Sequence, residues 1–376
     1  MEHAPASSGA IRVVLVDDSR AVKRALEQML AHQPGIEVVG SAADGAEGLC
    51  VVRQLDPDVV VLDVEMPGMD GIETVRALRK ENRRVAIIMF STLTDRGADV
   101  TLEALALGAS DYALKPSASG GFGPSAEQVK SELIARIRIH GARRRHVPRA
   151  LPPASGAART AAPGPAPDRS VPRLACPPAM RPAVLAIGCS TGGPNALVEF
   201  FGHLREPLNV PVVLVQHMPP IFTRMLAERL ARGSKWAVAE AEDGRLLEPG
   251  KVHVAPGGKH LVLARSGAGV STHVTEDPPI NYCRPSVDAL FRSVAELYGR
   301  ATLALVLTGM GEDGLEGGRA IQAAGGVVLA QDQESSVVWG MPGAVTRAKV
   351  AEAALPLDAL AQEVLRRTRA QARSAA

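Results

Sequence analysis

Aromatic residues make up only 3% of this 376-residue chain. Surfaces that bind nucleic acid by stacking bases need several aromatic side chains, so this scarcity argues against them. Net charge is also small, because 42 lysines and arginines are balanced by 40 aspartates and glutamates, leaving a formal charge of +2. A broad basic surface is therefore absent from the expected fold, and nucleic acid is not an expected partner.

Cysteine and long apolar runs are scarce as well. The four cysteines, Cys50, Cys176, Cys189 and Cys283, form no Cys-x-x-Cys pair. A disulfide framework or a structural zinc site is therefore not expected. This cysteine pattern is typical of a protein in a reducing compartment. No apolar run approaches the length of a membrane span, and residues 1–10 lack the apolar core of a signal peptide. We expect a cytoplasmic protein without direct membrane insertion.

Proline, in contrast, is concentrated between residues 141 and 181, together with alanine, serine and glycine. This composition predicts a flexible, Pro/Ala-rich linker. The flanking segments, residues 11–140 and 182–370, are each long enough to bury a hydrophobic core. The sequence therefore predicts two domains joined by a tether.

Short apolar runs alternate with amphipathic segments in residues 11–140. This alternation predicts a parallel, doubly wound (βα)5 domain of the α/β class. The expected strands are residues 11–16, 37–40, 59–62, 85–90 and 112–114, and the expected helices lie near 22–30, 46–55, 72–79, 98–107 and 128–139.

Polar residues follow several of these strands, namely Asp17, Asp18, Asp63, Ser91 and Lys115. In such sheets ligands bind beyond the carboxyl ends of the strands. Carboxylates gathered there repel one another unless a cation lies among them, and oxygen ligands suit Mg²⁺. A lysine and a hydroxyl nearby suit a phosphoryl group. The alternative is a set of strand-end polar residues that only face water.

Residues 61–71 read VLDVEMPGMDG and, with these strand-end residues, closely resemble the phosphorylation site of two-component receiver domains. The resemblance covers roughly residues 11–138 and implies Asp63 as the phospho-acceptor. It also implies that Mg²⁺ is bound by Asp17, Asp18, Asp63 and the Glu65 carbonyl. Ser91 and Lys115 are implied to contact the phosphoryl group.

The pattern of apolar runs and amphipathic segments in residues 182–370 predicts a second doubly wound, mainly parallel α/β domain. Its expected strands are residues 183–187, 210–215, 251–255, 260–264, 270–274, 301–307 and 327–330, and its expected helices lie near 197–204, 224–230, 286–298, 320–324 and 357–367.

A glycine-rich turn, GCSTGG at residues 188–193, follows the first strand of this domain. Its glycines allow close approach of the backbone, and its amides at a helix start favour negative charge. The turn suits a bound phosphate or the oxyanion of acyl transfer, and residues 188–192 match the G-x-S-x-G elbow. A turn that only packs a helix on the sheet is the alternative.

Three strand ends in the second domain carry Ser190, His217 and Asp313. In a parallel sheet they share one edge, which is the arrangement of a serine nucleophile, its general base and an orienting carboxylate. Cys189 is a less suitable nucleophile, because the exposed apex of an elbow is the following residue. Three other histidines, His253, His260 and His273, lack metal-ligand spacing and are expected at the surface. No cofactor is expected in this domain.

Several segments together closely resemble the chemotaxis protein-glutamate methylesterase/glutaminase (CheB) family: GCSTGG at 188–193, QHMP at 216–219, RPSVD at 284–288, TGMGEDG at 308–314 and WGMP at 339–342. The resemblance covers the whole chain, since that family joins a receiver, a linker and this catalytic domain. It implies the catalytic roles above for Ser190, His217 and Asp313, and implies that Thr191 and Met310 line the site. Two departures, Cys189 for the more usual alanine and Trp339 for tyrosine, remove no catalytic group.

The resemblance implies hydrolysis of glutamate γ-methyl esters on the cytoplasmic domains of chemoreceptors, with release of methanol. Deamidation of receptor glutamines is a second reaction that the same groups could serve. A chemotaxis histidine kinase would supply the phosphoryl group, and the unphosphorylated receiver would cover the catalytic face, with Tyr112 placed to report the change.

Two other functions compete with this interpretation. A phosphorylation-switched module that binds a nucleotide would need a phosphate-binding motif, but the turn lacks G-K-[ST] and G-x-G-x-x-G. A transcriptional regulator would need a helix-turn-helix after the linker, and none is predicted there.

Overall fold

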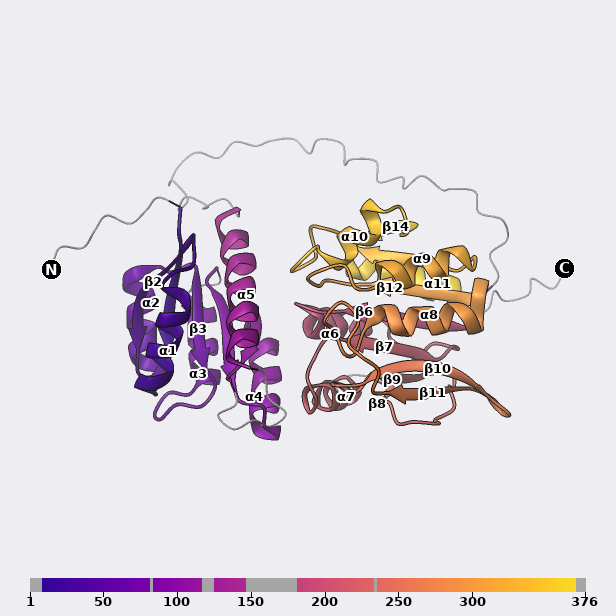
Figure 1. Ribbon diagram of the computed structural model, residues 1–376, viewed down its shortest axis with the longest axis horizontal. Coiled ribbons are helices and arrows are strands. Elements are labelled where there is room, and N and C mark those ends of the chain that lie inside the picture. The colour runs from indigo at the N-terminus through magenta and orange to yellow at the C-terminus, as the bar shows by residue number, and fades with distance from the viewer. Residues whose placement is uncertain (1–8, 82–83, 117–124, 147–180, 233–234, 370–376) are drawn as a thin grey trace, which may run out of the picture.

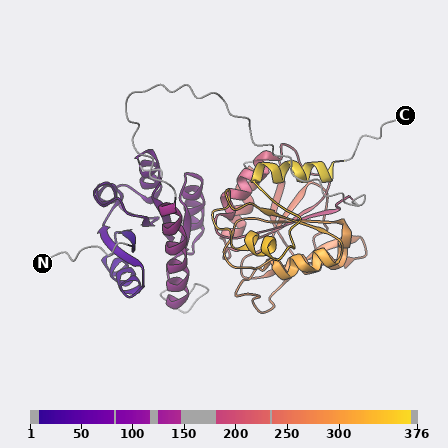
Figure 2. The ribbon, with the colours of Figure 1, turned by 90° about the horizontal axis from the view of Figure 1, so that it is seen from above.

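The computed structural model describes residues 9–81, 84–116, 125–146, 181–232 and 235–369. These residues form two α/β domains that lie side by side (Figures 1 and 2). Most of the predicted linker, residues 147–180, lies outside the described residues, and helix α5 (Ala126–His146) continues into the first part of its range.

The first domain contains a parallel sheet, as the alternating pattern predicted, and its strand order is β2-β1-β3-β4-β5. Its strands are β1 (Ile11–Val16), β2 (Ile36–Ala42), β3 (Val59–Asp63), β4 (Ala86–Ser91) and β5 (Asp111–Leu114). Its other helices are α1 (Arg20–Leu30), α2 (Gly45–Leu55), α3 (Gly71–Glu81) and α4 (Asp95–Ala106). Every residue of β3 and β4 is buried, because helices cover both faces of the sheet.

Local signals in the sequence set the helix boundaries. Ser19 caps α1 by accepting a hydrogen bond from the amide of Val22. At α2, Asp44 accepts from the amide of Glu47 at 2.8 Å, and the Glu47 carboxylate accepts from the amide of Ala43 at 2.6 Å. These reciprocal bonds satisfy amides that the first helical turn leaves without partners.

The second domain contains a seven-stranded parallel sheet with the order β14-β13-β12-β6-β7-β9-β8, beside an antiparallel β10-β11 hairpin. Its strands are β6 (Val184–Cys189), β7 (Val212–Gln216), β8 (Ala237–Glu240), β9 (Lys251–Val254), β10 (His260–Ser266), β11 (Gly269–Thr275), β12 (Thr302–Val306), β13 (Val327–Gln331) and β14 (Ala353–Leu355). Its helices are α6 (Gly193–His203), α7 (Phe222–Arg232), α8 (Val287–Tyr298), α9 (Leu315–Ala323), α10 (Met341–Arg347) and α11 (Leu357–Thr368), with a short 3₁₀ turn at Gly299–Ala301.

Three elements of this domain carry too weak a sequence pattern to have been predicted. Strands β8 and β14 are the two edge strands, and neither contains a buried residue. They therefore lack the apolar run that identifies an inner strand. Helix α10 begins with Met341-Pro342-Gly343, which resembles a turn, although proline is well tolerated in the first turn of a helix.

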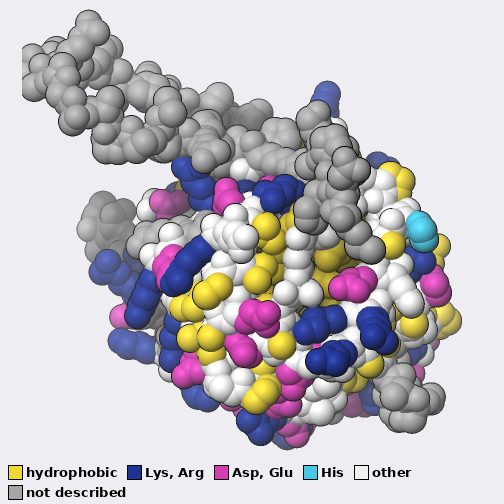
Figure 3. All heavy atoms as spheres, turned by 90° about the vertical axis from the view of Figure 1, so that its left-hand side faces the viewer, with side chains coloured by type: hydrophobic (Ala, Val, Ile, Leu, Met, Phe, Trp, Pro, Cys, Tyr) yellow, Lys and Arg dark blue, Asp and Glu magenta, His cyan; other side chains and the backbone are white. Residues whose placement is uncertain are grey.

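Surface composition agrees with the small net charge. Figure 3 shows the face of the first domain that is turned away from the second, on which basic and acidic side chains are interspersed. None of the helices that the structure describes combines the length and the apolar character that crossing a bilayer requires.

Candidate active site and phosphorylation site

Both candidate sites lie where the strand order of a parallel sheet reverses. In the first domain this point is between β1 and β3, and in the second it is between β6 and β12. Loops on either side of such a point diverge and leave a crevice beyond the carboxyl ends of the strands. The residues predicted from the sequence lie at or after the carboxyl ends of these strands and of their neighbours β4, β5 and β7.

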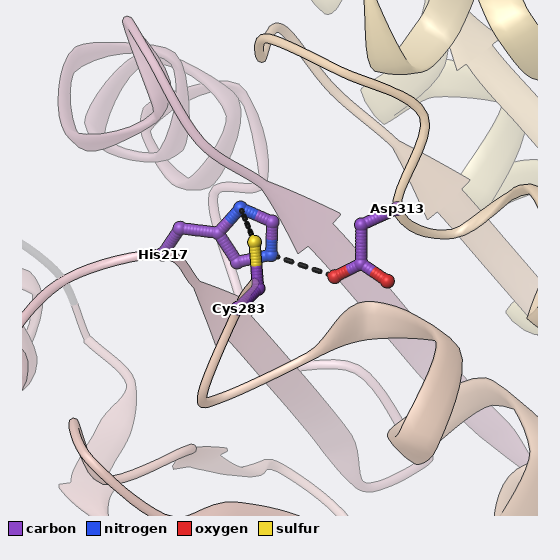
Figure 4. A group of neighbouring side chains, drawn as sticks. All are labelled: His217, Cys283 and Asp313. Atoms are coloured by element: carbon purple, nitrogen blue, oxygen red, sulfur yellow. Dashed lines mark hydrogen bonds and ion pairs between the residues drawn. The ribbon is translucent and has the colours of Figure 1, made fainter. Parts of the chain in front are cut away.

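His217 and Asp313 are in direct contact (Figure 4). The Nε2 atom of His217, the first residue after β7, lies 2.8 Å from Oδ2 of Asp313. Asp313 is buried and also accepts hydrogen bonds from the Ser286 hydroxyl at 2.8 Å and from the amides of Val287 at 2.7 Å and Asp288 at 3.1 Å. Because these donors form the start of α8, the positive end of the helix faces the carboxylate.

This environment favours charge on both partners. Burial disfavours the carboxylate of Asp313, but the hydrogen bonds from His217 and the α8 amides outweigh it and lower its pKa. Burial likewise disfavours the imidazolium, yet the hydrogen bonds to Asp313 and Cys283 raise the pKa of His217 to about 10. A pair of this kind stabilises the protonated imidazole that forms when a general base accepts a proton.

Ser190 lies in the turn between β6 and α6, and its backbone is fixed on three sides. Its amide donates to the carbonyl of Thr308 at 3.0 Å, and its carbonyl accepts from the Gly193 amide at 2.7 Å and from Nε2 of Gln216 at 2.9 Å. The turn is thus tied to the residues that follow β7 and β12. Among the described residues, no hydrogen bond joins the Ser190 hydroxyl to His217.

Of the two predicted lining residues, Thr191 is part of this turn and Met310 belongs to the loop after β12. Thr191 is buried and its carbonyl accepts from the Thr308 hydroxyl at 2.9 Å, whereas the Met310 side chain is 39% exposed. In the part of the chain that the structure describes, the amides of Thr191 and Met310 donate to no protein acceptor. Two backbone donors are therefore available beside Ser190.

Gly309 is a site residue that the sequence analysis missed. A Cβ atom there would lie 2.4 Å from Sδ of Met341, 2.8 Å from Cβ of Ser190 and 3.0 Å from its amide nitrogen. Only glycine allows the loop after β12 to approach the serine turn so closely. The sequence feature that could have identified Gly309 is its position in the TGMGEDG segment beside Asp313.

Ser286 and Asp288 belong to the RPSVD segment, from which the sequence did not indicate a role for either residue. Oδ1 of Asp288 accepts from the amides of Gly314 at 2.9 Å and Gly317 at 2.7 Å, so it holds the start of α9 just after Asp313. Burial raises the pKa of Asp288, with the nearby Asp313 charge acting in the same direction. Both residues position Asp313 without reaching the serine turn.

The expectation that three further histidines lie at the surface is wrong for two of them. His253 and His260 are buried, because they occupy inward-facing positions of β9 and β10. Nδ1 of His260 accepts from the Ser286 amide at 3.2 Å, and burial lowers the pKa of His253. His273 is half exposed and contacts Asp243 at 2.9 Å.

In the first domain, Lys115 joins two buried carboxylates. Its Nζ lies 2.8 Å from Oδ2 of Asp63 and 3.0 Å from Oδ2 of Asp17. Burial raises the pKa of Asp63 by more than Lys115 lowers it, and the charge of Asp17 adds to the rise. Asp63 is therefore a carboxylate whose charge the protein alone does not fully offset.

These residues fit a divalent cation. Carboxylate oxygens of Asp17, Asp18 and Asp63 all lie within 4.8 Å of one another, and Asp18 is exposed to solvent. A set of oxygen donors with an incompletely compensated charge is the kind of site that Mg²⁺ prefers. Asp17, Asp18 and Asp63 are thus the side chains that would hold it.

Among the described residues, the side chains of Glu65 and Ser91 bond to other partners than Asp63, and the expected roles of the Glu65 carbonyl and the Ser91 hydroxyl stay predictions. The Glu65 side chain is exposed and pairs with Arg96 at 3.1 Å, while its amide lies 3.4 Å from Oδ1 of Asp63. The buried Ser91 hydroxyl lies 3.2 Å from the carbonyls of Thr92 and Gly97 and makes no hydrogen bond to Asp63 among the described residues.

The first domain covers the serine turn of the second. The Tyr112 ring stacks on Phe222 with centroids 5.0 Å apart, and Nδ2 of Asn195 donates to the Leu105 carbonyl at 2.9 Å. Helix α4 also packs on α7, where Arg224 pairs with Asp95. A cavity of about 20 Å³ lies between the domains, lined by Ser190, Thr191 and His217 on one side and by Asp111, Tyr112 and Arg136 on the other.

Comparisons with known proteins identify both domains. Residues 185–364 match the family model of the CheB methylesterase, and residues 13–121 match that of the response regulator receiver domain. A protein-glutamate methylesterase/protein-glutamine glutaminase from a Nocardioides species is 51% identical over 95% of both chains. One of the same name from Trichodesmium erythraeum is 43% identical over 95% of this chain and 98% of its own.

A solved structure of the Thermotoga maritima CheB methylesterase catalytic domain is 40% identical, covers 50% of this chain and 99% of its own, and gives a TM-score of 0.48. The identity and coverage of the two full-length relatives settle the classification. The chain belongs to the CheB methylesterase family, with a response regulator receiver domain ahead of the methylesterase domain.

Proposed function

We propose that this protein hydrolyses γ-methyl esters of glutamate on the cytoplasmic domains of chemoreceptors, releasing methanol, and that it deamidates receptor glutamines at the same site. The hydrogen-bonded pair of His217 and Asp313 beside the Ser190 turn is the observation that carries this proposal. Ser190 is the nucleophile, His217 the general base and Asp313 the carboxylate that orients it.

The contacts of His217 assign its two ring nitrogens. Nε2 donates to Asp313, which leaves Nδ1 to accept the proton of Ser190. The Ser190 oxygen attacks the ester carbonyl, and the free amides of Thr191 and Met310 stabilise the oxyanion. Protonated His217 gives its proton to the departing methoxy group. Water activated by the same nitrogen then releases the glutamate.

The contact between the domains represents an inhibited form of the enzyme. A cavity of about 20 Å³ holds one water molecule but no ester-bearing side chain. The receiver domain must therefore move before a receptor reaches Ser190, and the missing hydrogen bond between Ser190 and His217 then has room to form. A chemotaxis histidine kinase supplies the signal by phosphorylating Asp63.

Phosphorylation changes the charge around Asp63 and Lys115. A phosphoryl group adds about one to two negative charges at a site where Lys115 already contacts two carboxylates. Mg²⁺, when bound by Asp17, Asp18 and Asp63, supplies the charge that a phosphoryl group requires. Lys115 follows β5 directly, and β5 also carries Tyr112, so its movement is coupled to the ring that stacks on Phe222.

The test is methanol release from membranes whose chemoreceptors carry isotopically labelled methyl esters. Wild-type protein should release labelled methanol, and Ser190→Ala should reduce the rate by about three orders of magnitude or more. Cys189→Ala is the matched control at the neighbouring position and should stay within a few-fold of wild type. Equal rates for Ser190→Ala and wild type would contradict the proposal.

A further inference from the structure

Cys283 contacts the imidazole of the proposed catalytic histidine (Figure 4), and its sulfur also lies within 4.8 Å of a carboxylate oxygen of Asp313. Its Sγ atom lies 3.7 Å from Nδ1 of His217, the ring nitrogen that Asp313 leaves available. The established activity gives this thiol no role. It is nevertheless placed beside the atom that has to accept a proton from Ser190.

A tight turn presents Cys283 to the histidine. Ile280 and Cys283 exchange backbone hydrogen bonds of 3.1 and 2.8 Å, and the two residues between them, Asn281 and Tyr282, adopt left-handed conformations with φ of 51° and 63°. Non-glycine residues rarely occupy this region, and they cluster at functional sites. The side chain of Asn281 donates to Asp288 at 3.2 Å, which ties the turn to the same network that holds Asp313.

The other described cysteines lack this setting. Cys189 is fully buried, and burial raises the pKa of its thiol, so it remains protonated and unreactive. Cys50 is exposed in the receiver domain and has no histidine beside it. Cys283 alone among them combines partial solvent access with an imidazole, the neighbour that activates cysteine thiols.

We propose that Cys283 is a modification site, at which oxidation of the thiol by a peroxide switches off ester hydrolysis. The inference rests on the proposed role of His217 as the general base.

The reaction uses His217 to transfer one proton. Nδ1 accepts the proton of the thiol, and the sulfur attacks one oxygen of hydrogen peroxide. A sulfur–oxygen bond forms as the oxygen–oxygen bond breaks, and the departing hydroxide takes the proton from His217 to become water. The thiol and peroxide thus give a sulfenic acid and water, with sulfur oxidised by two electrons and peroxide reduced.

The product blocks the base that Ser190 needs. The new hydroxyl on sulfur is placed within hydrogen-bonding reach of Nδ1, since the unmodified sulfur already lies 3.7 Å from it. A nitrogen occupied in this way cannot accept the serine proton. Thiol reductants reverse a sulfenic acid, so the block is reversible.

The experiment treats the full-length protein, activated by a small phosphodonor and Mg²⁺, with hydrogen peroxide. Methanol release is measured alongside the mass of the peptide containing Cys283 after trapping with a 1,3-diketone that reacts with sulfenic acids. Wild type should lose at least about tenfold in rate, in step with labelling of Cys283, and dithiothreitol should restore the untrapped protein. Cys283→Ser and Cys283→Ala should each retain most of their own starting rate.

A control variant separates this thiol from another oxidation target. Cys50→Ser should lose activity under peroxide as wild type does, because this change does not remove Cys283. Loss of activity in Cys283→Ser at the wild-type rate, or full labelling of Cys283 without loss of methanol release, would overturn the inference. A protein that releases no methanol before treatment contradicts the proposed function instead.

Discussion

The two domains place a buried carboxylate at the same point of the same kind of sheet, yet the two carboxylates differ. Asp313 accepts four hydrogen bonds, including one from His217, and its pKa is lowered. Asp63 has a close contact with Lys115 and a longer one with the Glu65 amide, and its pKa is raised. Under the proposed function, the number of hydrogen-bond donors distinguishes Asp313, which orients the base, from Asp63, which accepts the phosphoryl group.

The largest expected effect comes from removing the charge of Asp313, the carboxylate that accepts four hydrogen bonds. Asp313→Asn should reduce methanol release by about 10³–10⁴-fold, because the amide stabilises neither the required tautomer nor the imidazolium of His217. Activity is measured with the phosphodonor present, and circular dichroism checks that α8 and α9 remain folded. A loss smaller than about tenfold would mean that Asp313 is not the partner of the base.

A smaller loss is expected from crowding the serine turn without changing a reacting group. Gly309→Ala places a methyl group 2.8 Å from Cβ of Ser190 and should displace the nucleophile. A displacement of about 1 Å can cost about 100-fold in rate. Gly202→Ala is the matched control, since a Cβ there meets nothing within 4 Å, and it should retain wild-type activity.

The sequence could predict the alternation of elements and that most candidate site residues lie at one edge of each sheet, because strand ends in parallel sheets share an edge. It could not predict Gly309 or Cys283 as neighbours of the site. Their positions depend on how the loop after β12 folds back onto the serine turn and the loop before α8 folds back onto His217. The burial of His253 and His260 was missed for a related reason, since a short strand does not indicate which face another element covers.

The pH dependence of activity distinguishes the two acceptors beside His217. His217 must be neutral to act as the base, so the rate should rise as the pH approaches its pKa. Burial lowers this pKa, but the hydrogen bonds to Asp313 and Cys283 outweigh burial and raise it to about 10. Cys283→Ala removes one of those acceptors and should move the rising limb to lower pH. The measurement is the initial rate of methanol release between about pH 6 and 11. An unchanged or higher midpoint would argue against this role of Cys283.

The smallest expected effect concerns the contact between the domains. Arg224 and Asp95 are both partly exposed, so their ion pair contributes at most about 1 kcal/mol. Arg224→Ala should therefore raise methanol release without a phosphodonor by no more than about fivefold. Arg319→Ala breaks a similarly exposed pair with Glu316 within α9 and should leave this rate unchanged. A decrease for Arg224→Ala would contradict an inhibitory contact.

Under the proposed function, phosphorylation of Asp63 in one domain releases Ser190 in the other. Its most direct test compares methanol release with and without a small phosphodonor and Mg²⁺, for wild type and Asp63→Asn. The phosphodonor should stimulate wild type but not Asp63→Asn, in which the acceptor carboxylate is absent. Equal stimulation of both proteins would show that the receiver site does not control the serine site.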